Sequence, residues 1–204
     1  MNEDPFKNRP LEPRKDNDPV QTGQEKLAIT IEVAGPADWE EYKKIRLEAL
    51  KDSPSAFSYS TKNWDEKWKK DSGKNKLGWQ DPILHPMQFV MLLKEGTDVR
   101  GVAVASKKKD QKGVWVWRIS EVYVTRKLQG SGLGERLLRK VIDEIKSRKG
   151  AFEVKKITLN VNKAETQKSA FNLYKKLGFK EVKRLTEYFQ KFWEMELDLT
   201  AEKI

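Results

Sequence analysis

The 204-residue sequence contains no cysteine and a single histidine, His85. Without cysteine there can be no disulfide, no thiolate metal ligand and no cysteine nucleophile. One histidine is also too few for the clusters of imidazole ligands that hold zinc. We therefore expect a protein that uses neither a metal ion nor thiol chemistry of its own.

Long apolar runs are also lacking. No stretch approaches the roughly 20 consecutive apolar residues that a membrane-spanning helix needs, and the N-terminus lacks the apolar segment of a signal peptide. We therefore expect a cytoplasmic protein with no membrane partner. Residues 1–24 hold four of the eight prolines and almost no apolar periodicity. We predict a disordered tail there and a single domain over residues 25–200.

Charge is abundant. Charged residues make up 35% of the chain, hydrophobic residues 37%, and the net charge is +10. The seven tryptophans and eight phenylalanines still provide for a core. A basic surface attracts anions such as nucleotides, acidic proteins or nucleic acid without specifying one of them. Because the lysines are spread over many segments and no stacking platform is evident, nucleic acid is the less favoured partner.

Hydrophobic periodicity predicts strands and helices in the order β-α-α-β-β-β-α-β-α-β-β. The strands are predicted at residues 27–33, 88–94, 101–106, 114–125, 156–161, 179–185 and 189–199. Helices are predicted at residues 38–52, around Trp64 and Trp68, from Leu133 to Lys146, and at 166–177. Residues 70–86 contain many helix breakers and are predicted to form a long loop.

One segment, from Ile119 to Lys146, combines a buried strand, a glycine-containing loop and an amphipathic helix. Such a loop presents backbone N–H groups at a helix N-terminus, where the helix dipole favours negative charge. The loop is neither the G-x-G-x-x-G of a dinucleotide fold nor a P-loop; it consists of Gln129, Gly130, Ser131, Gly132, Leu133 and Gly134. We expect it to bind a pyrophosphate, assisted by the positive charges of Arg126, Lys127 and Arg136.

Two motifs resemble those of the GNAT superfamily of acyl-CoA-dependent N-acetyltransferases. The loop at 129–134 is similar to the family's Q/R-x-x-G-x-G/A motif, and residues 170–179 resemble its A-x-x-L-Y-x-x-L-G-F motif. The opening of the first helix is similar as well, so the resemblance covers residues 27–199. It implies an α/β (α+β) fold with a mixed, mostly antiparallel central sheet of about seven strands, flanked by four helices.

The resemblance also implies acetyl-CoA as the cosubstrate. The backbone of residues 129–134 would bind its pyrophosphate, and the strand edge at Val122, Tyr123 and Val124 would hydrogen-bond the pantetheine as another strand would. Family members often carry an asparagine where this chain has Gln167. Asn162 is the alternative amide for that contact, and the choice between the two is open.

Acetyl transfer to an amine needs a neutral amine, a donor for the oxyanion and a proton for the leaving thiolate. The resemblance gives the last role to Tyr174, which is otherwise a core-facing aromatic, and the Val124 N–H is a candidate oxyanion donor. Glu121 is the candidate base, directly or through water. It is predicted to share a strand face with Trp117 and Tyr123, where aromatic surroundings would raise its pKa.

Two alternatives accompany the assignment of the base. The preferred alternative for Glu121 is a solvated or arginine-paired strand residue. His85 is a further candidate base carried by the long loop, and is otherwise a surface histidine.

We therefore expect an N-acetyltransferase that moves acetyl from acetyl-CoA to a primary amine by direct attack in a ternary complex. The acceptor is a small-molecule amine or a protein amino group, and the enzyme is a monomer or a homodimer. The alternative is a nucleic-acid- or ribosome-associated binding protein on the same fold. The lysines at 107–109 and in segment 67–76 motivate this alternative.

Overall fold

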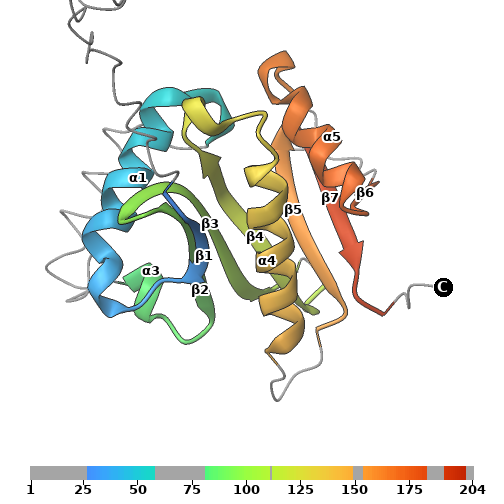
Figure 1. Cartoon of the computed structure of the whole chain (residues 1–204). Helices are drawn as coiled ribbons and strands as arrows, with labels where there is room; N and C mark the ends of the chain where they lie inside the picture. Colours follow the sequence, from blue (N-terminus) through green and yellow to red (C-terminus); the bar gives the residue numbers. More distant parts are fainter. Residues whose placement is uncertain (1–26, 58–80, 111, 149–153, 183–190, 201–204) are drawn as a thin grey trace, which may run out of the picture.

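The computed structural model describes residues 27–57, 81–110, 112–148, 154–182 and 191–200. These residues form a seven-stranded sheet in the order β1-β2-β3-β4-β5-β7-β6 (Figure 1). The strands are β1 (Ile29–Val33), β2 (Gln88–Glu95), β3 (Asp98–Lys109), β4 (Trp115–Val124), β5 (Lys156–Asn162), β6 (Lys180–Val182) and β7 (Phe192–Asp198). Neighbouring strands are antiparallel except β4 and β5, which are parallel. The predicted mixed, mostly antiparallel sheet is confirmed.

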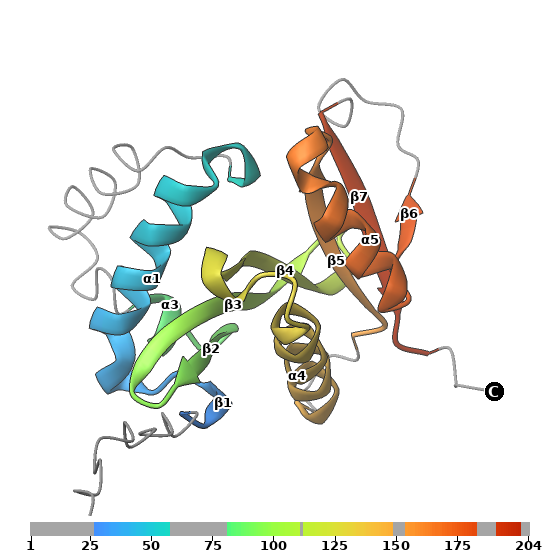
Figure 2. The same ribbon diagram turned by 45° about the horizontal axis from the view of Figure 1, so that its top comes forward.

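Helices cover both faces of the sheet (Figure 2). Helices α1 (Trp39–Asp52) and α3 (Asp81–Leu84) lie on one face, and α4 (Leu133–Ser147) and α5 (Lys168–Lys176) on the other. The short helix α3 occupies part of the predicted loop at 70–86. The predicted tail and the predicted helix around Trp64 and Trp68 lie outside the described residues. No helix in the described ranges is both long and apolar enough to cross a membrane.

Apolar periodicity explains why these helices sit where they do. The stripe of α4 is buried along its whole length, through Leu133, Leu137, Leu138, Val141, Ile142 and Ile145. It packs against the odd-numbered residues of β2, whereas α1 packs against Val90 and Leu92 of the same strand. A strand covered on both faces needs apolar residues at successive positions, which accounts for the run Phe89–Leu93.

The side chains of strand β4 switch between the two faces of the sheet part-way along the strand. Glu121 has a φ of 57°, in the left-handed region, and the β3–β4 register shifts between Val102 and Val104. Trp117 therefore faces the α4 core, whereas Tyr123 belongs to the α1 core. A one-residue bulge reverses the alternation of side chains. The predicted common face for Trp117, Glu121 and Tyr123 is therefore wrong.

The pairing of β4 with β5 is short. In the described chain it is confined to Trp117 opposite Ile157 and Arg118 opposite Thr158. Beyond these pairs the two strands lean apart, and the gap between them opens toward the loop that precedes α4 (Figure 1). The bulge at Glu121 lies just past the last pair, so the edge of β4 facing β5 is available to a ligand.

Candidate active site

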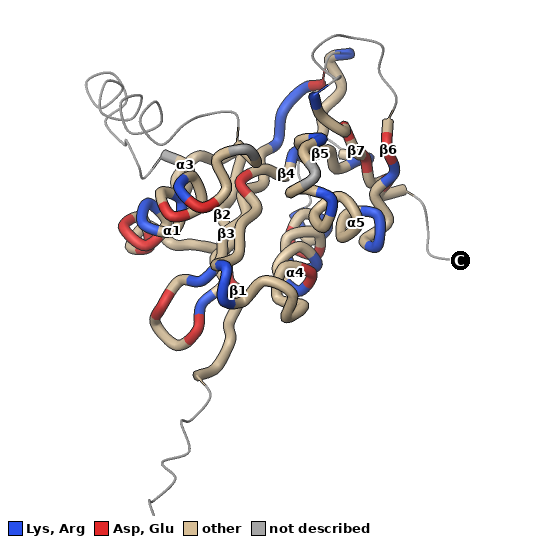
Figure 3. Tube along the Cα trace, turned by 90° about the horizontal axis from the view of Figure 1, so that it is seen from above, with Lys and Arg blue, Asp and Glu red and all other residues tan. Residues whose placement is uncertain are grey.

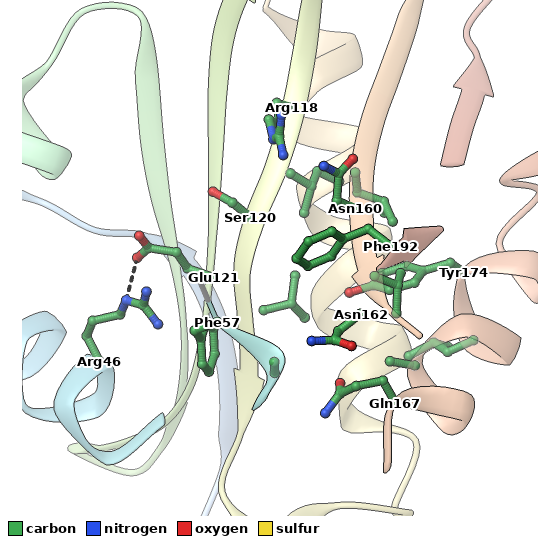
Figure 4. Close-up of a pocket in the computed structure, with 17 residues that line it drawn as sticks. Arg46, Phe57, Arg118, Ser120, Glu121, Asn160, Asn162, Gln167, Tyr174 and Phe192 are labelled. Atoms are coloured by element: carbon green, nitrogen blue, oxygen red, sulfur yellow. Dashed lines mark ion pairs between the residues drawn. The ribbon is translucent and has the colours of Figure 1, made fainter. Parts of the chain in front are cut away.

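A cleft of about 310 Å³ lies where β4 and β5 part (Figure 4). Its lining comes from α1, the 3-10 turn at Pro54–Ala56, β4, β5, α5 and β7. The residues that line it and were singled out from the sequence are Glu121, Val122, Asn162, Gln167 and Tyr174. The fold thus brings together residues that lie more than 50 positions apart in the chain.

The glycine loop leads into the N-terminus of α4. Gly130 and Gly132 have φ values of 79° and 83°, which glycine adopts without a steric penalty. The N–H of Arg136 donates to the Gly132 carbonyl at 3.1 Å, so this bond closes the first turn of α4. The preceding N–H groups, from Leu133 to Glu135, have no helical carbonyl to bond. They give the N-terminus of α4 the donors that an anion requires.

Other groups of the loop hold it in place. The Gln129 side chain donates from Nε2 to the Val124 carbonyl at 2.8 Å, and the Ser131 hydroxyl donates to the Leu128 carbonyl. Leu133 is buried beneath the loop. A side chain at Gly134 would contact Leu173 of α5, a residue that lines the cleft. The loop is therefore fixed between the end of β4 and α5.

The three cations predicted to assist the loop differ in their contacts. Arg126 donates from Nη2 to the Asp52 carbonyl at 2.9 Å, which directs its charge to the end of α1. Lys127 and Arg136 are exposed beside the loop. Of the three, these two are placed to attract an anion toward the N-terminus of α4.

The backbone at the end of β4 offers a donor to the cleft. The Thr125 N–H donates to the Arg100 carbonyl of β3 at 2.8 Å. Because successive N–H groups of a strand point to opposite edges, the Val124 N–H points toward β5. The Tyr123 side chain points elsewhere, since its hydroxyl donates to Glu48 and Asp52 of α1 at 3.1 and 2.8 Å. By the same alternation the backbone groups of Tyr123 point toward Val102 of β3, so the structure directs neither the side chain nor the backbone of Tyr123 into the cleft.

Tyr174 lies on α5 and is buried in the wall of the cleft. Its ring packs edge-on against Phe179, with the ring centroids 5.9 Å apart. Figure 4 shows its hydroxyl directed into the cleft. Burial raises the pKa of the Tyr174 phenol above its ordinary value, so the hydroxyl keeps its proton at neutral pH. It is thus a proton donor available inside the cleft.

Glu121 is held by two residues of α1. Its Oε2 accepts a hydrogen bond from the Tyr42 hydroxyl at 2.9 Å and lies 3.0 Å from Nε of Arg46. Arg46 is buried, and its guanidinium stacks 4.3 Å above the centroid of the Phe57 ring. The structure therefore shows the arginine-paired form of Glu121, and its role as a base stays a prediction. A non-glycine residue at positive φ costs free energy, which is typical of functional sites.

Replacing Glu121 by alanine is expected to lower the free energy of unfolding by about 3 kcal/mol, because the buried Arg46 charge loses its carboxylate. Glu121→Gln keeps a hydrogen-bond acceptor and should cost less. Urea unfolding of the three proteins measures the difference. Equal unfolding midpoints for wild type and Glu121→Ala would show that the ion pair does not stabilise the fold.

Asn162 and Gln167 both line the cleft. The Asn162 Oδ1 accepts a hydrogen bond from the Ala164 N–H at 3.0 Å, which ties the end of β5 to the turn before α5. Gln167 precedes the first residue of α5. The fold brings the two amides to the same wall, and which of them contacts a cosubstrate stays a prediction.

His85 is not brought to the cleft. It is exposed after α3, and its Nδ1 accepts a hydrogen bond from the Met87 N–H at 3.1 Å. The cleft has further polar lining that the sequence reasoning missed, namely Arg46, Arg118, Ser120 and Asn160. Alternation offered a signal for Asn160, because it lies two positions before Asn162 on one strand and therefore on the same face. Among the described residues, no group of three or more His, Asp or Glu side chains is placed to hold a metal ion.

The cleft and the helix N-terminus define a site for an extended ligand with an anionic end. Such a ligand would add its length to the free edge of β4 and place its anion at the start of α4. The model of the acetyltransferase (GNAT) family matches residues 46–179, and the chain belongs to that family. No curated protein matches the sequence at a significant level.

Solved acetyltransferases share the fold. A putative acetyltransferase, yncA, from Salmonella typhimurium, determined with acetyl-CoA, is 20% identical with a TM-score of 0.58, over 87% of this chain and 97% of its own. NAA60 from Arabidopsis thaliana, in complex with acetyl-CoA, is 13% identical with a TM-score of 0.60, over 85% and 100%. A ribosomal-protein-alanine N-acetyltransferase from Brucella melitensis is 19% identical with a TM-score of 0.57, over 83% and 99%.

Proposed function

We propose that this protein is an N-acetyltransferase that transfers the acetyl group of acetyl-CoA to a primary amine by direct attack in a ternary complex. The observation that carries the proposal is the cleft between β4 and β5, whose lining residue Leu173 lies beside Gly134 at the N-terminus of α4, in a chain of the GNAT family. Two structures with this fold, yncA and NAA60, were determined with acetyl-CoA, which supports the choice of cosubstrate.

The cleft and the glycine loop together offer groups for acetyl-CoA along its length. The N–H groups from Leu133 to Glu135 would bind the pyrophosphate, because Gly130 and Gly132 turn the loop so that a phosphate can approach. The open edge of β4, through the backbone groups of Val122 and Val124, would hydrogen-bond the pantetheine amides. The amides of Asn162 and Gln167 lie on the opposite wall.

Bound acetyl-CoA supplies a thioester whose carbonyl carbon the amine attacks. The Val124 N–H then donates to the oxygen that becomes negative, as an oxyanion hole does. Tyr174 keeps its proton in the resting site and gives it to the departing sulfur, which needs one. Glu121, directly or through water, removes the proton that the attacking amine loses.

Acetyl-CoA at 100 times its Kd is expected to raise the melting temperature by about 5 °C or more, because binding to the folded state adds about 2.7 kcal/mol. Differential scanning fluorimetry measures the shift, with ATP at the same concentration as a control for nonspecific anion binding. No shift at millimolar acetyl-CoA would refute the proposal.

The alternative, a nucleic-acid-binding protein on this fold, rests on the basic end of β3 (Figure 3). Lys107, Lys108 and Lys109 lie there opposite the start of β4, and Lys109 Nζ lies 5.5 Å from the centroid of the Trp115 ring. Salt-sensitive binding to RNA without any binding of acetyl-CoA would favour this alternative.

A further inference from the structure

The charged residues that line the cleft within the described ranges are Arg46, Arg118 and Glu121. Arg46 and Glu121 form an ion pair at 3.0 Å, and their charges offset one another. The net charge of this lining is therefore +1, and Arg118 contributes it. It lies at the narrow end of the cleft, because its opposite residue, Thr158, belongs to the last pair before β4 and β5 part.

The guanidinium of Arg118 has a neutral partner. The amide of Asn160 satisfies its own hydrogen bonds when its oxygen accepts from Nη2 of Arg118 at 2.9 Å and its nitrogen donates to the Leu159 carbonyl. Figure 4 draws this amide the other way round. Among the described residues, none of the carboxylates forms an ion pair with Arg118. A guanidinium has several N–H donors arranged to bind a carboxylate through two parallel hydrogen bonds. Arg118 uses one of these donors for Asn160, and the others are available to a ligand.

A second cation, Lys108, lies near Arg118, and it is accompanied by the carboxylate of Glu194. Lys108 lies two residues along β3 from Ser106, which is opposite Arg118, so Lys108 and Arg118 share one face of the sheet. Burial and the charge of Arg118 lower the pKa of Lys108, and Glu194 on β7 opposes that shift. Glu194 offsets one of the two cations, so one net positive charge remains at this place for a bound anion.

Arg118 is also within reach of the reacting groups. Ser120, which lines the cleft next to Glu121, lies two residues from Arg118, and two residues of a strand span about 7 Å. The two side chains share a face, because the bulge comes after them. A small ligand whose amine lies near Glu121 and Tyr174 can therefore reach Arg118 with an anionic group of its own.

Resting on the proposed function, we infer that Arg118 binds a carboxylate of the acceptor, and that the acceptor is a free amino acid or a similarly small amine with a carboxylate next to its amino group. In a peptide, the group next to the terminal amine is a neutral amide instead of a carboxylate. A peptide acceptor would leave the Arg118 charge without an anionic partner inside the cleft, at a cost in free energy.

The test uses the full chain and acetyl-CoA, with release of free thiol as the readout. Each L-amino acid is compared with its own amide and its decarboxylated amine. Phosphoethanolamine tests whether a phosphate replaces the carboxylate. The best amino acid should exceed its amide by about 10- to 100-fold in kcat/KM, as expected for a charge-assisted pair of hydrogen bonds. Equal use of acid and amide, or acetylation confined to peptides, neutral amines or phosphoethanolamine, would overturn the inference.

Variants assign the preference to Arg118. Arg118→Gln should raise the KM for the amino acid by at least tenfold, with an unchanged KM for acetyl-CoA, while Arg118→Lys retains part of the preference. Arg100→Gln is the matched control: Arg100 is a paired cation on β3 that does not line the cleft. Thermal melting shows that each variant folds. A preference for the acid that persists in folded Arg118→Gln would overturn the inference.

The experiments distinguish a failure of this inference from a failure of the proposed function. Binding of acetyl-CoA together with acetylation of amines that lack a carboxylate leaves the N-acetyltransferase proposal standing and removes the role of Arg118. Absence of acetyl-CoA binding removes both.

Discussion

Gly132→Val is expected to weaken the binding of acetyl-CoA by at least about 100-fold, because two or more charge-assisted hydrogen bonds to the pyrophosphate would be lost. Gly132 precedes α4 with a φ of 83°, a conformation that a β-branched residue adopts only with strain. A valine at this position would rotate the chain out of that conformation and turn the N–H groups of Leu133 and Gly134 away from the phosphates. Isothermal titration calorimetry with acetyl-CoA measures the effect.

Gly113 provides a matched control for Gly132. Its φ is 77°, and a side chain added there meets no neighbouring atom among the described residues, as at Gly132. It lies in the turn between β3 and β4, away from the glycine loop. Gly113→Val should therefore cost a similar amount of folding free energy, about 1–2 kcal/mol, and leave the affinity for acetyl-CoA unchanged. If both variants, or neither, lost affinity, the loop would not be the pyrophosphate site.

Tyr174→Phe is expected to lower turnover by about 100-fold or more while changing the affinity for acetyl-CoA little, because general acids contribute about 10²- to 10⁴-fold. The substitution removes one hydroxyl and keeps the ring that packs on Phe179. Steady-state kinetics together with calorimetric binding of acetyl-CoA separate the two effects. Unchanged turnover in a folded Tyr174→Phe variant would remove Tyr174 from the chemistry.

The pH dependence of the wild type supplies an independent check on Tyr174. The protonated phenol is the active form, and burial raises its pKa, so this form persists through and above the ordinary range of a tyrosine. Turnover should rise with pH as the acceptor amine becomes neutral and should show no fall up to about pH 9.5. A loss of turnover below that pH in the wild type, absent from Tyr174→Phe, would contradict the assignment.

The parts of the fold that depend on local patterns could be predicted from the sequence. The apolar stripe of α4 is one continuous pattern, and the glycines before it mark the turn that it needs, so the predicted helix start at Leu133 agrees with the structure. The predicted helix at 38–52 matches α1 closely for the same reason. The strand order could be anticipated only through the family resemblance, because pairing partners lie far apart in the chain.

The bulge in β4 could not be read from the sequence. Left-handed positions usually carry glycine or asparagine, and here the position is occupied by a glutamate. Strict alternation then assigned Glu121 to the face of Trp117, whereas it pairs with Arg46 on α1. The burial of Arg46 was not predicted, because Arg46 follows Ile45 in an amphipathic helix and arginine is usually a surface residue. Its burial depends on a carboxylate 75 positions later in the chain.

The two residue pairs that join β4 to β5 form a short connection between two parts of the sheet. On one side of it the ladder runs through β1–β4, and on the other through β5, β7 and β6. A molecule bound in the gap would contact both parts of the sheet. It would connect them noncovalently, in addition to the connection that α4 and α5 provide by packing against the sheet. Occupancy of the cleft should therefore slow amide hydrogen exchange at the free edges of β4 and β5 more than in β1, and so couple the rigidity of the two halves.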